Sequence, residues 1–381
     1  MSGYSRHVRI WRGLQFLLRG WITRRFCLES EPIRTPGPIL LIANHVTAWD
    51  PLLLAVALGE KHVYYVASEH ILRSGFPGKI IGWLLAPIPR RKGASGRDTV
   101  KSCMNHLQAG HSVCLFAEGE QSWDGRSIPV VEGTGSLVRH AGATLVTYRL
   151  EGGYLSLPRW GKGLRRGRVR GRVAGVYPPE LLTGMTKEEI NRLLNRDIRE
   201  NAWNRQIREP EHYRGKRQAE SLERFLYLCP GCGCIGTLKS KNDRLQCPCG
   251  LDLRFTDMGF FDPSAPFSTL PEWEDWQKRQ LKARKFMTDL ETGCLFSDED
   301  TALVLIGPGH RQEALGNGRI AQYEDALECA GRRFELDGIQ DMAMTQANRL
   351  LFTFGDGYYQ IRCRGNTNLR KYLEIWKESK N

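Results

Sequence analysis

Short apolar runs alternate with amphipathic segments between Pro38 and Leu150. The runs are short and bounded by polar turn residues, as buried strands are. They predict strands at 39–43, 62–67, 112–116 and 144–150. The segments between them have helical spacing and predict helices at 51–59, 95–109 and 131–140. This alternation predicts an α/β domain with a mostly parallel sheet flanked by helices.

The N-terminal segment, residues 4–28, has apolar positions at helical spacing with arginines between them. The apolar positions are Val8, Trp11, Leu14, Leu18, Trp21 and Ile22, and the arginines are Arg6, Arg9, Arg12, Arg19, Arg24 and Arg25. Tryptophan and leucine with arginine are typical of a helix that lies in a membrane interface. An ordinary surface helix is the alternative. We expect residues 1–30 to form such an amphipathic helix on an anionic membrane surface.

An arginine- and glycine-rich segment, residues 159–173, follows the last predicted strand. Its first part is typical of a turn and its second part alternates like a strand. It would bind phosphates well, or it is a solvated basic hairpin. Thr186 and Glu189 have capping-box spacing, which predicts a helix from 187 to about 208. This helix would close a domain that spans residues 31–222.

Five cysteines gather between Cys229 and Cys249. Cys229 and Cys232 form one pair and Cys247 and Cys249 the other, each followed by glycine, about 15 residues apart. Four thiolates on two tight turns are the ligand set of a structural zinc ion. We predict a zinc ribbon over residues 223–260. Cys234 is a fifth candidate, so a swapped ligand stays open.

The C-terminal third is predicted to be a helical linker, residues 261–290, and a small α+β domain, residues 291–381. Residues 271–287 have the pattern of a helix. Short strands are expected at 302–306, 333–336, 349–354 and 357–363, and a last helix at 367–378. Strands followed by one helix fit a small barrel or a domain that resembles the pleckstrin-homology class.

Charge is distributed unevenly along the 381 residues. Residues 1–228 hold 35 Lys/Arg and 20 Asp/Glu, whereas the rest hold 20 and 22, within a net charge of +13. A basic front half suggests an anionic partner. No stretch reaches the about 18 apolar residues of a membrane span, and the start lacks a signal peptide's pattern. Clustered cysteines suit a reducing compartment, so we expect a cytoplasmic protein, peripheral on the inner face of the cell membrane.

His45 and Asp50 carry the candidate chemistry. His45 follows the apolar run 39–43, and Asp50 comes five residues after it. A loop that leaves a buried strand can aim an imidazole at a hydroxyl while a carboxylate fixes its tautomer. This pair predicts a general base with its orienting partner.

Three blocks in order resemble the phospholipid/glycerol acyltransferase family. The first is the histidine, four residues and the aspartate at 45–50. The second is an apolar stretch that ends in Arg90, and the third, Phe116 to Ser122, is similar to the family's Phe-Pro-Glu-Gly-Thr-Arg-Ser. The resemblance covers about residues 35–180 and leaves the cysteine pairs and the C-terminal module outside.

The resemblance implies the chemistry and its partners. His45 would take a proton from the acceptor hydroxyl, and Asp50 would stabilise the imidazolium. Arg90, Glu118, Gly119 and Arg126 would bind substrate. The donor would be acyl-CoA or acyl carrier protein and the acceptor a lysophospholipid such as 1-acyl-glycerol-3-phosphate. No cofactor is needed for acyl transfer, and activity should rise as pH climbs through the neutral range.

The third block departs from the family at Ala117, Glu120 and Gln121, which stand where the family has proline, threonine and arginine. In the family that arginine helps to hold the acceptor's phosphate. Two alternatives follow: another cation, among Arg90, Arg91, Lys92 and Arg126, takes over, or the acceptor has no terminal phosphate.

Two other functions remain open on the residues alone. A zinc ribbon with net positive charge is compatible with nucleic-acid binding, although nucleic acid is not the expected partner because the ribbon's own half is slightly acidic. A catalytically degenerate membrane scaffold would also keep the fold, because a fold alone does not determine chemistry.

Overall fold

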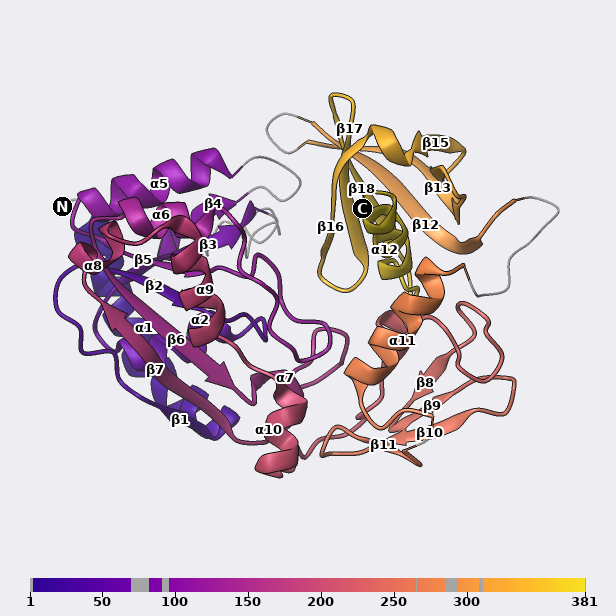
Figure 1. Cartoon of the computed structure of the whole chain (residues 1–381), viewed down its shortest axis with the longest axis horizontal. Helices are drawn as coiled ribbons and strands as arrows, with labels where there is room; N and C mark the ends of the chain where they lie inside the picture. The colour runs from indigo at the N-terminus through magenta and orange to yellow at the C-terminus, as the bar shows by residue number, and fades with distance from the viewer. Residues whose placement is uncertain are drawn as a thin grey trace. The chain divides into compact units, whose positions relative to one another are not determined.

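The computed structural model describes residues 3–69, 82–90, 96–264, 266–284, 293–307 and 311–380 (Figure 1). Its contacts divide the chain into two compact units. The first unit lies within Met1–Gly215, and the second contains Lys216–Asn381 together with Trp160–Lys162. Each unit has its own sheets and its own buried core.

The first unit is built on a seven-stranded sheet with the order β1-β7-β6-β2-β5-β3-β4. Its strands are β1 Leu28–Ser30, β2 Ile39–Ala43, β3 Val63–Ser68, β4 Ile88–Arg90, β5 Ser112–Phe116, β6 Thr144–Glu151 and β7 Val169–Tyr177. Neighbouring strands are parallel except for β6 and β7, which are antiparallel. The predicted mostly parallel sheet is confirmed.

Helices cover this sheet, as Figure 1 shows. They are α1 Gly3–Phe26, α2 Asp50–Leu58, α5 Arg97–Gln108, α6 Thr134–His140, α7 Gly153–Ser156, α8 Pro179–Thr183, α9 Lys187–Asp197 and α10 Ala202–Arg208. Leu40 and Ile42 of β2 pack in one cluster with side chains of α5, α6 and α9. Because Ile39 and Leu41, which point the other way, are also fully buried, both faces of the central strand are covered.

The helix expected at 187–208 is two helices, and this is a correction. The predicted capping box of Thr186 and Glu189 starts α9. Asn201 then interrupts the helix, because its side chain accepts hydrogen bonds from the backbone N–H groups of Trp203 and Asn204 and starts α10. Hydrogen bonds from backbone N–H groups to the Asn201 side chain replace the backbone hydrogen bonds that would continue one long helix.

Helix α1 covers most of the segment expected to be helical, and it leaves large apolar side chains in solvent. Trp11, Ile22 and Phe26 are buried against the rest of the first unit. Phe16, Leu17 and Trp21 have exposed fractions of 88%, 71% and 49%. Across the described residues, every helix is too short or too polar to span a lipid bilayer.

The second unit begins with a small antiparallel sheet in the order β11-β10-β9-β8. These strands are β8 Lys239–Lys241, β9 Arg244–Gln246, β10 Asp252–Phe255 and β11 Phe261–Asp262, after the 3-10 helix η1 Leu222–Arg224. Helix α11, Leu270–Lys282, follows. The end of the helix predicted at 271–287 lies partly outside the described residues.

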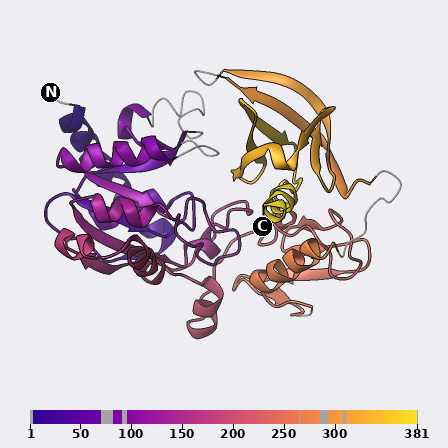
Figure 2. The ribbon, with the colours of Figure 1, turned by 45° about the horizontal axis from the view of Figure 1, so that its top comes forward.

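A seven-stranded antiparallel sheet and helix α12, Arg370–Ser379, complete the second unit (Figures 1 and 2). The strands are β12 Phe296–Ile306, β13 Gln312–Gln322, β14 Ala326–Cys329, β15 Arg332–Glu335, β16 Ile339–Thr345, β17 Arg349–Phe354 and β18 Gly357–Cys363, with η3 Leu336–Gly338 before β16. The sheet order is β15-β14-β13-β12-β18-β17-β16. Strands followed by one helix agree with the small α+β domain expected, and its likeness to the pleckstrin-homology class stays a prediction.

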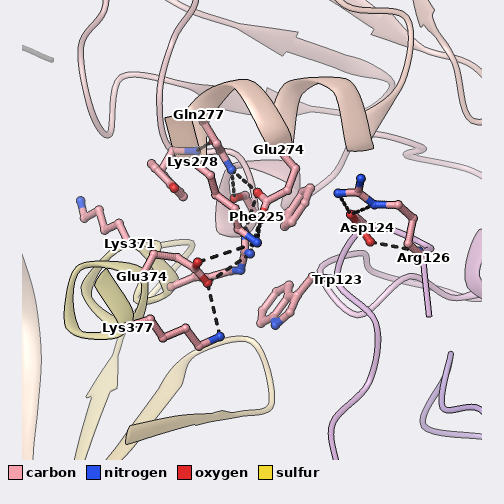
Figure 3. Close-up of polar contacts among 12 residues, drawn as sticks. Trp123, Asp124, Arg126, Phe225, Glu274, Gln277, Lys278, Lys371, Glu374 and Lys377 are labelled. Atoms are coloured by element: carbon pink, nitrogen blue, oxygen red, sulfur yellow. Dashed lines mark hydrogen bonds and ion pairs between the residues drawn. The ribbon is translucent and has the colours of Figure 1, made fainter. Parts of the chain in front are cut away.

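Ion pairs connect α11 and α12 (Figure 3). Arg370 donates to Glu274 at 2.8 Å, and the Lys278 ammonium lies 2.8 Å from the same carboxylate. Burial alone would raise the pKa of Glu274, but the charges of Arg370 and Lys278 lower it to about 2. The carboxylate therefore stays ionised inside the unit.

Candidate active site

His45 and Asp50 meet at the carboxyl end of β2. His45 Nδ1 lies 2.8 Å from Asp50 Oδ2, and Asp50 is the first residue of α2. With Nδ1–H donating to the carboxylate, Nε2 of a neutral imidazole is the free acceptor. The His45 side chain is 20% exposed, whereas Asp50 is fully buried. The imidazole can therefore reach a substrate while its partner is shielded from water.

Asp50 also holds the loop that carries His45. Its Oδ2 accepts hydrogen bonds from the backbone N–H groups of Val46 at 2.7 Å and Thr47 at 2.9 Å. Its Oδ1 accepts from Thr47 Oγ1 at 3.0 Å. All these partners donate, so a carboxylate fits this position better than any neutral side chain. Sequence analysis did not single out Thr47. The signal that could have found it is a hydroxyl side chain three residues before Asp50, within reach of the carboxylate.

Asn44 fixes the strand end next to His45. Its side-chain amide donates to the carbonyl oxygen of Leu150 at 2.8 Å and accepts from the Leu150 N–H at 2.7 Å. The residue is fully buried. This two-way contact ties the end of β2 to β6, and sequence analysis missed it because Leu150 is distant in the chain.

The glutamate-glycine turn after β5 lies against the histidine loop. Glu118 Oε1 accepts from the His45 backbone N–H at 3.1 Å, and the Ser122 N–H donates to the His45 carbonyl oxygen at 3.0 Å. The imidazole stacks on the Phe116 ring with centroids 4.4 Å apart. Since β2 and β5 are parallel neighbours, with Ala43 opposite Phe116, both turns leave the same edge of the sheet. The first and third sequence blocks therefore form one site.

Glu118 uses both carboxylate oxygens on the backbone. The second oxygen, Oε2, accepts from the Ile128 N–H at 2.9 Å. Burial raises the pKa of Glu118 to about 8, against the lowering effect of these two amides, and the charges of Asp50 and Glu120 raise it further. In this arrangement Glu118 positions the His45 loop, and contact of its carboxylate with substrate stays a prediction.

Gly119 has a backbone conformation that a side chain would strain. Its φ is +75°, and a Cβ there would lie 3.1 Å from Val131 Cγ2. Its N–H donates to the Phe116 carbonyl oxygen at 3.2 Å, which closes the turn. Glycine lets the chain turn tightly beside the imidazole.

Two arginines near this turn are paired with carboxylates. Arg126 Nε donates to Asp124 Oδ2 at 2.6 Å, as Figure 3 shows. Arg159, which sequence analysis did not single out individually, donates to Glu120 Oε2 at 2.8 Å. Its guanidinium carbon also lies 4.1 Å from the Trp123 ring centroid.

Arg90 ends β4 at the carboxyl edge of the same sheet. Strand β3 lies between β4 and β5, so Arg90 starts two strands away from the turn at Glu118 and Gly119. The other cations considered for this role, Arg91 and Lys92, lie outside the described residues.

The four predicted cysteine ligands come together in the second unit. The sulfur atoms of Cys229, Cys232, Cys247 and Cys249 all lie within 4.8 Å of one another. The Cys229–Cys249 and Cys232–Cys247 sulfur pairs are 3.6 and 3.8 Å apart. Tetrahedral zinc with Zn–S bonds of about 2.3 Å needs separations of about 3.8 Å, so the cluster fits a metal ion. Cys234 is not part of this group of four.

Comparisons with known proteins show what the first unit is similar to. A family model described as Acyltransferase matches residues 25–151. The 1-acyl-sn-glycerol-3-phosphate acyltransferase BAT2 of Brassica napus chloroplasts is 30% identical over 150 residues, or 38% of this chain and 41% of the relative. LPAT1 of Arabidopsis thaliana, a chloroplast enzyme of the same name, is 31% identical over 149 residues, or 38% of this chain and 40% of the relative.

Among solved structures, the 1-acyl-sn-glycerophosphate acyltransferase PlsC from Thermotoga maritima is similar over 50% of this chain and 75% of that chain, with 16% identity and a TM-score of 0.41. The chain spans about two fifths of the length of the curated relatives that it matches. Residues 25–151 are thus similar to the Acyltransferase family, and about 150 residues of the chain are similar to 1-acyl-sn-glycerol-3-phosphate acyltransferases. The cysteine cluster and the C-terminal sheet lie outside the matched residues.

Proposed function

We propose that this chain transfers a fatty acyl group from an acyl thioester, acyl-CoA or acyl carrier protein, to the hydroxyl of a lysophospholipid or related lipid. The observation that carries this proposal is the His45–Asp50 contact at the carboxyl edge of an acyltransferase-family domain. An imidazole held in this way is the group that activates a hydroxyl.

The reaction needs no covalent enzyme intermediate. His45 Nε2 takes the proton of the acceptor hydroxyl as its oxygen attacks the thioester carbonyl carbon. The buried carboxylate of Asp50 stabilises the imidazolium that forms. The tetrahedral intermediate then breaks its carbon–sulfur bond, and the thiolate receives the proton from the imidazolium. An ester and a free thiol leave the site.

The acceptor is expected to come from an anionic membrane surface, with the protein peripheral on the cytoplasmic face. The exposed Phe16, Leu17 and Trp21 of α1 have the composition of an interfacial helix. The Trp21 ring lies 5.6 Å from the ring of Trp49, which belongs to the loop between His45 and Asp50. One exposed apolar side chain of α1 therefore lies against the catalytic loop, which suits a lipid acceptor.

The test is an acylation assay on the purified full chain with acyl-CoA or acyl carrier protein as donor and a panel of lysolipids as acceptors. His45→Ala should lower kcat/KM by about 10³-fold, because the general base is lost. His140→Ala is the matched control, since His140 is exposed on α6 and contacts only the Ser136 carbonyl of its own helix among the described contacts. The proposal fails if no acceptor is acylated or if His45→Ala is as active as the parent.

We also propose that the four-cysteine cluster binds one structural zinc ion. Cys229, Cys232, Cys247 and Cys249 would supply four thiolates, which leaves no coordination position for a substrate or water. The zinc would hold the two cysteine turns together and would take no part in acyl transfer.

A further inference from the structure

The turn beside His45 is acidic. Between Phe116 and Arg126 the chain has three carboxylates, at Glu118, Glu120 and Asp124, and one arginine. Among the described residues, the fold adds the cation Arg159 here, through its contacts with Glu120 and Trp123. The raised pKa of Glu118, about 8, leaves that group mostly protonated at neutral pH, so two arginines face the two carboxylates of Glu120 and Asp124 and give no surplus of positive charge among these residues.

Both arginines are already engaged. Arg159 is 5% exposed, and it donates to Glu120 at 2.8 Å and to the Gln121 carbonyl oxygen at 3.0 Å. Arg126 is bound to Asp124 by its side chain at 2.6 Å, and its backbone N–H donates to the same carboxylate. Glu120 is 25% exposed and Arg126 is 33% exposed, so this turn presents to solvent a carboxylate and a guanidinium that already has a carboxylate partner.

A terminal phosphate carries about −1.5 to −2 charges at neutral pH and binds best to an arginine that can offer two parallel N–H groups. Among the described residues of this turn, a phosphate would have to displace a carboxylate from Arg126 or Arg159, or lie beside Glu120. Gln121 offers only a neutral amide. Arg90 lies on β4, which is two strands from β5 in the sheet. At a strand spacing of about 4.8 Å, the backbones of β4 and β5 are about 10 Å apart.

We propose that Glu120 and Gln121 are specificity-determining residues and that the acceptor is a monoacyl lipid whose headgroup presents hydroxyl groups, with no terminal phosphate, to this turn. The inference rests on the acyl transfer proposed above and names its acceptor class. A carboxylate and an amide accept hydrogen bonds from hydroxyls, and the carboxylate repels a phosphate dianion.

The experiment compares acceptors with the full chain. Acylation rates are measured with 1-acylglycerol 3-phosphate, with 1-acylglycerophosphoglycerol and with monoacylglycerol, each in the same detergent micelles. We expect kcat/KM to be about tenfold higher or more for one of the two acceptors without a terminal phosphate. Glycerol 3-phosphate, added as a free competitor, should not inhibit. A preference for 1-acylglycerol 3-phosphate, or competition by glycerol 3-phosphate, overturns the inference and leaves acyl transfer intact. If no acceptor is acylated, acyl transfer itself is wrong and the inference falls with it.

Two variants test the residues named. Gln121→Arg adds a cation. Glu120→Gln removes the partly exposed carboxylate and keeps the size of the side chain. Each should raise the efficiency with 1-acylglycerol 3-phosphate relative to monoacylglycerol by about tenfold. Glu180→Gln is the control, because it changes the net charge by the same amount as Glu120→Gln at an exposed position of α8. Circular dichroism checks folding of each variant. An unchanged acceptor ratio in both folded variants contradicts the assignment.

Discussion

At the scale of single residues, Glu118 determines where the His45 loop lies. Its two oxygens each accept from a backbone N–H group, those of His45 and Ile128. In Glu118→Gln one oxygen becomes an NH₂ group that faces an N–H donor, so one buried amide loses its acceptor. We expect a loss of about 1–3 kcal/mol in the free energy of unfolding. We also expect kcat to fall, because the imidazole is no longer held at its place.

Urea unfolding and steady-state kinetics measure the two effects on Glu118→Gln. The matched control is Glu180→Gln. It removes an exposed carboxylate at a position distant from His45 in the sequence. If Glu118→Gln keeps both the stability and the kcat of the parent, then the backbone contacts of this carboxyl are not what positions the loop.

At the scale of elements, α1 packs on a cluster of aromatic and histidine side chains. The cluster consists of Tyr4 and His7 of α1 with His62, Tyr64, His106 and His111. Burial lowers the pKa of His62 to about 4, and the charges of His7, His111 and His106 lower it further. The pKa values of His7, His106 and His111 are lowered too, in each case first by burial. Protonation of this cluster therefore opposes packing of α1.

This cluster gives a pH dependence of stability with a defined sign. His62 binds its proton less readily in the folded chain than in the unfolded chain, whose histidines titrate at about pH 6.5. The contribution of neutral His62 to the free energy of unfolding is therefore fully present above about pH 6.5. It is lost as the pH falls towards 4. His62→Phe keeps an aromatic ring and should reduce the fall in Tm on acidification, whereas His140→Phe at an exposed site should not. An equal fall in the parent and in His62→Phe would remove this cluster as the cause.

Sequence patterns predicted the elements that are buried and regular, and missed those set by contacts between distant residues. Strand β2 was predicted with the observed bounds because a central strand buried on both faces is a continuous apolar run. Strand β1 was missed, since three residues paired at an edge with β7 leave no pattern. The His45–Asp50 contact was predictable from spacing within one loop. The role of Arg159 was not, because its partner Glu120 lies 39 residues away in the chain.

At the scale of the whole molecule, the family model matches only residues 25–151 of the first unit, and the second unit has its own stabilising interactions. Its four cysteine side chains lie together beside a small sheet that buries Leu245, Leu253 and Phe255, whereas α11 and α12 are joined by the buried pair of Glu274 and Arg370. A structural metal site of this kind commonly contributes to folding, because its ligands are brought together only in the folded chain. The free energy of metal binding is then part of the free energy of folding of this unit.

Removal of zinc should therefore affect one unit more than the other. We expect metal analysis to find one zinc per chain, and calorimetry to show two unfolding transitions because each unit has its own core. A chelator, or the double substitution Cys229→Ser with Cys232→Ser, should abolish zinc binding and lower the Tm of one transition. Cys234→Ser, outside the group of four, should keep both the zinc and the two transitions. Zinc loss in Cys234→Ser would show that the ligand set is swapped, and an unchanged melting profile without zinc would show that the metal does not stabilise the ribbon.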